Sequence, residues 1–350
     1  SNVKFLDSIN RPEDMVTYAL ELGYKGMAFT DHECLSAAVS IIKVRDQVQK
    51  EHPDFKFIFG NEIYLIDETE VHNTDNFFHF ILLAKDLEGW KQLRTLSSRA
   101  WDRSYMYKGI LRTPTTYQDI EEVIGSNPGH IIASSACIGG ELGVTILNHN
   151  KERLNKFVNW CIKIFSKDNF YIELQPALYE EQQLVNKVLI NLSKFFGLKY
   201  IFTTDSHYLK KDDMLLHSVF LNSKQSKDRE TEKFYKYTYL MSIEEITENL
   251  KQNGLSDSMI NAGFDATMEI YNKIENYDFR HSTIVPAPFL PQFEVIHLFK
   301  NYYDKYPFIK KFAYSNVDQD RYLLYQIEQG FITKKQELCD LRVERINIEL

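Results

Sequence analysis

Residues that could bind a divalent metal ion follow the predicted β-strands of this chain, one strand after another. These residues, each with the apolar run that precedes it, are His32 (26–30), Glu62 (55–60), Cys137 (130–136) and Asp205 with His207 (199–204). Asp7 stands just before the first predicted helix. Imidazole, carboxylate and thiolate groups are ligands for Zn²⁺, Mn²⁺ and Fe²⁺, and a mixed set of them is typical of multinuclear hydrolytic sites.

Each of these residues also has a simpler interpretation. In an extended segment residues i and i+2 point to the same side, so Asp205 and His207 could converge on one ion. Asp205 could equally cap the following helix, with His207 on the surface. Cys137 could be a small buried apolar residue, and Glu62 could lie on a solvated strand face. Taken together, ligand-type residues after successive strands favour a metal cluster.

His79 is less clear from its pattern. It lies early in the apolar run 77–84, on the same face as Phe77, Ile81 and Leu83, and this alternation alone predicts a core histidine. Other chemistries have no support, because the chain contains no GxxxxGK[ST] loop, no GxGxxG turn and no GxSxG elbow. The two glycines that follow Cys137 in IGGE indicate open backbone near the site, which is a weak signal.

The elements that must position these residues alternate along the first 225 residues or so. Short β-rich runs are separated by helical stretches, beginning with a helix from about 12 to 22 that Pro12 starts and Gly23 ends. Strands joined by helical crossovers predict a parallel sheet or barrel. In such a barrel functional groups gather at the C-terminal rim of the strands. The sequence therefore predicts an α/β fold with a polar rim.

Composition limits the class of protein further. Apolar residues make up 44% of the 350, and no apolar run approaches the length of a membrane span. The absence of such a run predicts no membrane partner. The four scattered cysteines include no CxxC pair, which favours a reducing, cytoplasmic environment. The net charge of −8 is unusual for a protein that grips nucleic acid through its own surface. It suits a site that gathers cations.

Residues 285–295, which contain the cluster VPAPFLPQF, are the best candidate for a linker. We expect a barrel domain over 1–284, and a helical, charge-rich segment over 296–350. The stretch 224–238 is charged and is predicted to be a loop, and 242–277 is predicted to be helical.

Five segments resemble the polymerase and histidinol phosphatase (PHP) domain that opens the α subunit of bacterial replicative DNA polymerase III. They are AFTDHECLSAAV (28–39), FGNEIYLID (59–67), HFILLAKDLEGWKQL (79–93), ASSACIGGELG (133–143) and TTDSHYLKKDD (203–213). The resemblance implies a distorted seven-stranded (βα) barrel that holds two or three divalent ions, either Zn, Mn or Fe. It also implies that 296–350 begins the polymerase palm.

By position, the metal ligands of the family match seven residues of this chain. One of them is His79, so the resemblance implies that His79 is a metal ligand and not a core residue. The implied ligands are Asp7, His32, Glu62, His79, Cys137, Asp205 and His207, of which Glu62, Asp205 and His207 are the expected catalytic residues. The family normally opens with a His-x-His that is absent from this chain. Either two ligands are lost, or a short segment between Phe5 and Leu6 is missing; the matching flanks favour the second.

The resemblance implies a metal-dependent phosphoesterase that acts as a 3′→5′ proofreading exonuclease on the primer end of DNA. Its partners would be the remainder of the polymerase and other replisome subunits. The family's polymerase aspartates lie further downstream, so this chain is not expected to polymerise. Two alternatives stay open. One is a metal-stabilised scaffold without turnover, and the other is a small-molecule phosphatase, which does not explain the polymerase-like residues 239–350.

Overall fold

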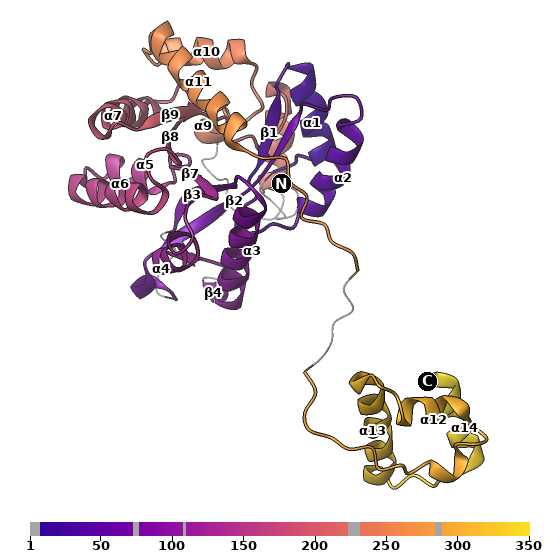
Figure 1. Ribbon diagram of the computed structural model, residues 1–350. Coiled ribbons are helices and arrows are strands. Elements are labelled where there is room, and N and C mark those ends of the chain that lie inside the picture. The colour runs from indigo at the N-terminus through magenta and orange to yellow at the C-terminus, as the bar shows by residue number, and fades with distance from the viewer. Residues whose placement is uncertain (1–7, 73–76, 108–109, 223–231, 284–288) are drawn as a thin grey trace. The chain divides into compact units, whose positions relative to one another are not determined.

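The computed structural model describes residues 8–72, 77–107, 110–222, 232–283 and 289–350 (Figure 1). The chain divides into two compact units, Ser1–Phe279 and Arg280–Leu350, and each is described by itself. The predicted ligand Asp7 and part of the predicted linker, 284–288, lie outside the described residues.

A seven-stranded mixed sheet forms the centre of the first unit, in the order β1-β2-β3-β7-β8-β9, with β6 paired to β2. Its strands are β1 (Gly26–Phe29), β2 (Lys56–Ile66), β3 (Phe78–Ala84), β6 (Thr115–Thr116), β7 (Ile131–Ser134), β8 (Phe170–Leu174) and β9 (Lys199–Phe202). The end strands β1 and β9 line the same cavity, so the sheet is strongly curled. A separate hairpin joins β4 (Tyr105–Tyr107) to β5 (Ile110–Arg112).

Strand β3 runs antiparallel to both of its neighbours, whereas the pairs β1–β2, β7–β8 and β8–β9 are parallel. The start of β3 therefore lies beside the C-terminal end of β2, where Tyr64 is opposite His79. An all-parallel sheet would have put the start of this strand at the opposite edge. This reversal brings His79 to the polar rim.

Helices of the first unit surround the sheet (Figure 1). They are α1 (Pro12–Glu21), α2 (Ala38–Val48), α3 (Leu87–Asp102), α4 (Tyr117–Ile120), α5 (Glu141–Leu147), α6 (Lys151–Phe165), α7 (Glu180–Phe196), α8 (Met214–Asn222), α9 (Glu232–Tyr235), α10 (Ile243–Gln252) and α11 (Asp257–Lys273). Short 3₁₀ turns lie at Glu68–Glu70 and Lys211–Asp213, and Glu121–Gly125 is a π-helical turn after α4.

The two faces of the curled sheet pack differently. One face joins a large core with the helices, which includes Phe57, Phe59 and Leu82. The inner face packs against α11 through a smaller cluster, made of Ile58, Leu83, Ile132, Tyr171, Ile201, Ala266, Ile270 and Ile274. Because side chains alternate along a strand, the inner-face residues near the other edge are Glu62, His79 and Glu173. The inner face is thus apolar at one end and polar at the other.

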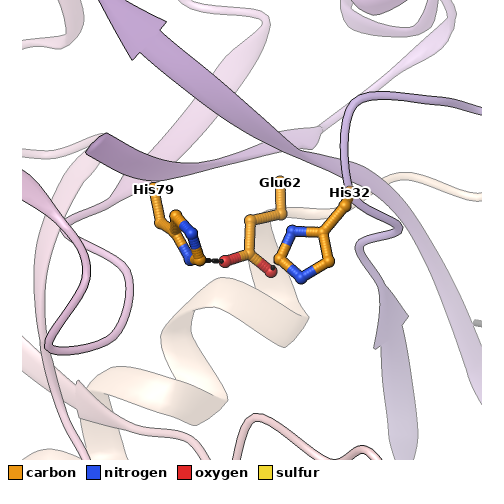
Figure 2. Close-up of side chains that lie close together, drawn as sticks. All are labelled: His32, Glu62 and His79. Carbon is orange, nitrogen blue, oxygen red and sulfur yellow. Dashed lines mark ion pairs between the residues drawn. The ribbon is translucent and has the colours of Figure 1, made fainter. Parts of the chain in front are cut away.

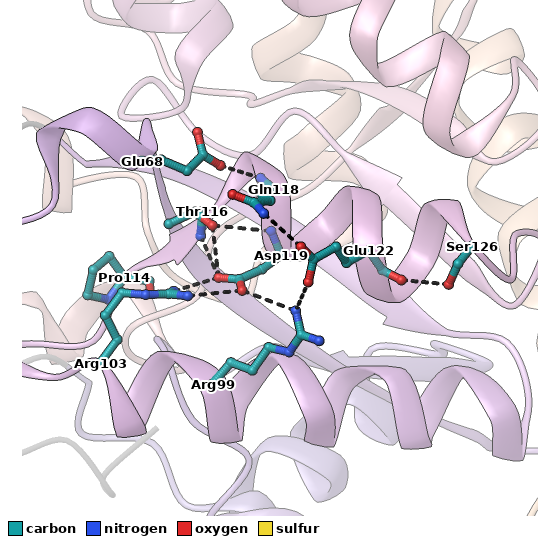
Figure 3. Close-up of polar contacts among 9 residues, drawn as sticks. All are labelled: Glu68, Arg99, Arg103, Pro114, Thr116, Gln118, Asp119, Glu122 and Ser126. Atoms are coloured by element: carbon teal, nitrogen blue, oxygen red, sulfur yellow. Dashed lines mark hydrogen bonds and ion pairs between the residues drawn. The ribbon is translucent and has the colours of Figure 1, made fainter.

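A network of ion pairs ties α3 to the short segment β6–α4 (Figure 3). Arg103 bonds the Asp119 carboxylate through two nitrogens, at 2.5 and 3.0 Å. Asp119 also accepts from the Thr116 backbone N–H and hydroxyl at 3.0 Å, while Arg99 bridges to Glu122 at 2.6 Å. Asp119 is 4% exposed, so both of its oxygens need these partners. The network fixes the edge of the sheet next to β2.

The second unit is helical, as predicted for 296–350, with α12 (Pro307–Ala313), α13 (Asp318–Thr333), α14 (Asp340–Glu349) and a 3₁₀ turn at Lys300–Tyr302. Its core contains Phe299, Ile309 and Leu324. The fully buried Glu328 accepts the backbone N–H groups of Ile296 and Leu298, both at 2.7 Å.

The predicted fold class is confirmed: the protein is α/β, with a curled seven-stranded sheet followed by a helical C-terminal part. The predicted strand 55–60 continues to Ile66 as one long strand, β2, so Glu62 lies within it. Helix α5 and the β4–β5 hairpin were not predicted. Of the predicted loop 224–238, residues 224–231 lie outside the described residues, and Glu232–Tyr235 form the short helix α9. None of the described helices is long and apolar enough to span a membrane.

Candidate metal centre

Three of the predicted ligands converge at the polar end of the inner face (Figure 2). Donor atoms of His32, Glu62 and His79 all lie within 4.8 Å of one another. Glu62 lies between the two imidazoles: its Oε1 is 2.7 Å from His79 Nδ1 and its Oε2 is 3.5 Å from His32 Nδ1. Each carboxylate oxygen therefore faces a different histidine.

Backbone pairing fixes these three side chains. A parallel bridge joins His32 to Glu62, in which the Glu62 N–H donates to Asp31 O at 3.0 Å and the Glu33 N–H donates to Glu62 O at 2.8 Å. His79 reaches the same point from the start of the antiparallel β3. The three residues come from segments that are far apart in sequence and share one rim.

The Glu62 carboxylate is a buried charge, since the residue is only 5% exposed. Burial alone would raise its pKa, but the charges of His32 and His79 outweigh burial and hold the pKa of Glu62 at about 2. The groups that lower this pKa are imidazoles, which can bind a metal ion as readily as a proton.

Cys137 adjoins this group, with its Sγ 3.4 Å from His79 Nδ1. Burial, and then the negative charges of Asp205 and Glu62, raise the pKa of the Cys137 thiol. The glycines behind it allow close approach: the His79 N–H donates to Gly139 O at 3.1 Å, and a Cβ on Gly140 would lie 2.2 Å from Ser135 O. The weak sequence signal of IGGE thus has a physical reason.

Asp205 and His207 follow β9 and line the same cavity. The His207 Nδ1–H donates to the Asp205 backbone carbonyl at 2.7 Å, which leaves Nε2 as the acceptor nitrogen. The turn that follows is closed instead by Asp213, which accepts from the Lys210 N–H at 3.1 Å. Helix capping, the simpler interpretation of Asp205, has no hydrogen bond to support it among the described residues.

The cavity inside the curled sheet has a volume of about 350 Å³. Its polar end carries His32, Glu62, Cys137, Asp205 and His207, and its apolar end is closed by α11. Glu173 also lines it, and burial raises the pKa of Glu173 to about 7, although Ser134 and Thr203 donate hydrogen bonds to it at 2.6 and 2.5 Å.

Backbone strain occurs beside these residues, as it also does at His72, His149 and Ser166 elsewhere in the first unit. Glu33, Ala136 and Asp205 have positive φ values of 55°, 59° and 47°. Non-glycine residues rarely adopt this left-handed conformation, which costs energy and is often kept at functional sites. At the ends of β1, β7 and β9 the chain therefore turns sharply to aim His32, Cys137 and Asp205.

Of the seven predicted ligands, six lie around this polar end and Asp7 is outside the described residues. The tightest group contains three of them, and ligand roles for all seven stay predictions. The core interpretation of His79 is wrong, because its side chain is 28% exposed and contacts Glu62. Sequence reasoning missed Glu33, a buried residue whose carboxylate accepts the Thr113 N–H at 3.0 Å, and Glu173.

The donor set fits a divalent transition metal. Two imidazoles, a buried carboxylate and an adjoining thiol are borderline ligands of the kind that Zn²⁺, Mn²⁺ and Fe²⁺ take. A carboxylate with one oxygen turned to each histidine is suited to bridging two ions. Removing the positive neighbours would leave Glu62 as an uncompensated buried charge, which is costly.

Known proteins are similar to this chain in sequence. The PHP domain model matches residues 1–177 of the 350. Probable DNA polymerase YorL of Bacillus subtilis strain 168 is 39% identical over 379 residues, which covers 100% of this chain and 29% of that protein. The DNA polymerase III subunit alpha of Thermus aquaticus is 30% identical over 62% of this chain and 17% of its own length.

The chain therefore belongs to the PHP domain family. It spans less than a third of the length of these curated relatives, which are named DNA polymerases. Because the alignment with YorL is longer than the 350 residues here, YorL contains residues without a counterpart in this chain. A solved structure, named a metal-dependent phosphoesterase of Bifidobacterium adolescentis, is 14% identical with a TM-score of 0.38, over 57% of this chain and 84% of its own, and adds nothing to the argument.

Proposed function

We propose that this chain is the metal-dependent phosphoesterase domain of a replicative DNA polymerase, and that it removes nucleotides from the 3′ end of DNA as a proofreading exonuclease. The observation that carries the proposal is the convergence of His32, Glu62 and His79 beside a cavity of about 350 Å³. Relatives named DNA polymerases point to DNA as the substrate.

Two or three bound Zn, Mn or Fe ions would polarise the scissile phosphate and activate water for its attack. The chain's own residues hold the ions and shape the site. Glu62 presents one oxygen toward each histidine, and the hydrogen bond from His207 Nδ1 orients its ring. Asp205 adds charge from the end of β9, and Cys137 adds a thiol from the end of β7 that would lose its proton on binding a metal ion. The buried walls exclude bulk water.

The proposed partners are the primer 3′ end, the remainder of the polymerase and other replisome subunits. The relatives extend well beyond the region aligned here, so we propose that polymerisation belongs to residues outside 1–350, and that 296–350 begins the palm. A barrel domain over 1–284 and a linker over 285–295 are part of the same proposal.

A single-stranded oligonucleotide labelled at its 3′ terminal nucleotide tests the activity. We expect the metal-loaded chain to release labelled mononucleotide, to leave a 5′ label on progressively shorter strands, and to lose both effects in a chelator. Bound metal together with an intact 3′ label after prolonged incubation would contradict the exonuclease proposal and would favour the scaffold.

A further inference from the structure

A column of stacked planar groups leads away from the candidate metal centre. His79 stacks on Tyr64, with ring centroids 5.0 Å apart and planes 14° apart. Tyr64 stacks in turn on Phe77 at 5.8 Å and 23°, and the Arg112 guanidinium lies 5.0 Å from the Phe77 ring centroid. We call Tyr64, Phe77 and Arg112 the stacking column.

The fold places this column beside the metal centre. Tyr64 and Glu62 point to the same face of β2, and Tyr64 is the cross-strand partner of His79. Arg112 ends the β4–β5 hairpin, and the next residue, Thr113, donates its N–H to Glu33, the neighbour of His32. Tyr64, Phe77 and Arg112 all remain partly exposed.

Cross-strand aromatic pairs commonly serve only to stabilise a sheet. The nearby contact between Phe78 and Arg153 is an example of a contact with a purely structural role. Phe78, on the opposite face from Phe77, is covered by the Arg153 guanidinium at 4.6 Å, and the Nε of Arg153 donates to Glu141 at 2.9 Å. By contrast, the Nε of Arg112 is buried and has no hydrogen-bond partner among the residues that the structure describes.

We propose that the stacking column is a binding site for the unpaired bases at the 3′ end of a DNA strand. Aromatic rings and arginine planes bind single-stranded bases by stacking, with little dependence on sequence. The Arg112 guanidinium lies over the Phe77 ring, where a base would stack if Arg112 moved aside, and its N–H donors suit a phosphate oxygen. This inference rests on the proposed function for the identity of the substrate.

The charge of the chain supports stacking as the mode of binding. With a net charge of −8, the protein as a whole repels a phosphate backbone, so an attraction other than overall charge must contribute to its affinity for DNA. Stacking supplies this affinity, and only bases that have left the duplex can stack on protein side chains. The column should therefore select frayed or mismatched 3′ ends over paired ones.

The test measures binding of a fluorescein-labelled oligothymidylate, with a hydrolysis-resistant phosphorothioate at its last linkage, by fluorescence anisotropy. The variant is Phe77→Leu, which keeps an apolar side chain and removes the ring. The matched control is Phe78→Leu, the same change at the adjacent position on the opposite face. A second oligonucleotide lacks its terminal bases, and metal content is measured for each protein.

We expect Phe77→Leu to weaken binding of the complete oligonucleotide by about tenfold, in line with the loss of one stacked base. The abasic oligonucleotide should bind all three proteins equally weakly, and Phe78→Leu should match wild type on both. Equal binding by wild type and Phe77→Leu, or the same loss on both oligonucleotides, would overturn the proposal.

The two proposals fail in different ways. Base-dependent binding through Phe77 without any release of a 3′ label would keep the stacking column and reject the nuclease. Exonuclease activity that Phe77→Leu leaves unchanged on single strands, with unchanged binding, would keep the nuclease and reject the column.

Discussion

Replacing Glu62 by glutamine should lower exonuclease activity by about a thousandfold or more, because metal ions contribute several kcal/mol to such reactions and each 1.4 kcal/mol is about tenfold in rate. Glutamine fills the same volume but carries no charge to hold cations between His32 and His79. Rates of 3′-label release by wild type and Glu62→Gln at equal protein concentration measure the effect.

Glu141→Gln is a matched control for this change. Glu141 is a buried carboxylate of 4% exposure that accepts a hydrogen bond from Arg153 and lines no part of the cavity. The folded control variant should retain wild-type activity and metal content. A Glu62→Gln variant as active as this control would remove Glu62 from the site.

Asp205→Asn and His207→Ala should each remove most of the stabilisation that metal gives to the folded chain. An ion that binds only the folded state adds its binding free energy to folding. At a metal concentration a hundredfold above Kd this is about 3 kcal/mol, or roughly 5–10 °C in Tm for a chain of this size. In both variants we expect less than half of the wild-type shift, measured by thermal melting with and without chelator.

The alternative interpretation of Asp205 as a helix cap makes the opposite prediction. Asparagine caps about as well as aspartate, so Asp205→Asn would be nearly neutral and His207→Ala silent. Asp213→Asn provides a comparison, since Asp213 does close the turn after β9 through the Lys210 N–H. Chelator responses equal to wild type in both Asp205→Asn and His207→Ala would reject them as ligands.

Much of this site could be predicted because the ends of β-strands can be located in the sequence. A strand is recognised by its β-rich residues, and polar residues directly after several parallel strands must share one rim. This reasoning located His32, Cys137, Asp205 and His207, which line a single cavity. Glu62 lines the same cavity but lies within β2 and not at its end, so the strand-end argument was wrong about its position.

His79 shows where that reasoning fails. Its alternation with Ile81 and Leu83 correctly identifies the inner face, yet nothing in the pattern gives the direction of the strand. Only the antiparallel pairing with β2 and β7 turns the first residues of β3 toward the rim. The resemblance supplied the assignment that periodicity could not.

The stacking column and the strained turns were also beyond sequence reasoning. Tyr64 and Arg112 are 48 positions apart in the numbering, and both contact Phe77 because of the pairing of β2 with β3 and the position of the hairpin β4–β5. The positive φ values at Glu33, Ala136 and Asp205 could not be predicted, because glycine is the residue that usually indicates this conformation and none of the three is a glycine.

The metal content of the chain, purified without chelator and measured by elemental analysis, tests the central claim most directly. We predict at least one equivalent of Zn, Mn or Fe per chain, held by His32, Glu62 and His79, with Asp205 and His207 contributing. A chain with its opening strand complete should hold two or three. Less than half an equivalent in the wild-type chain, unchanged after incubation with each of the three metals, would contradict the account.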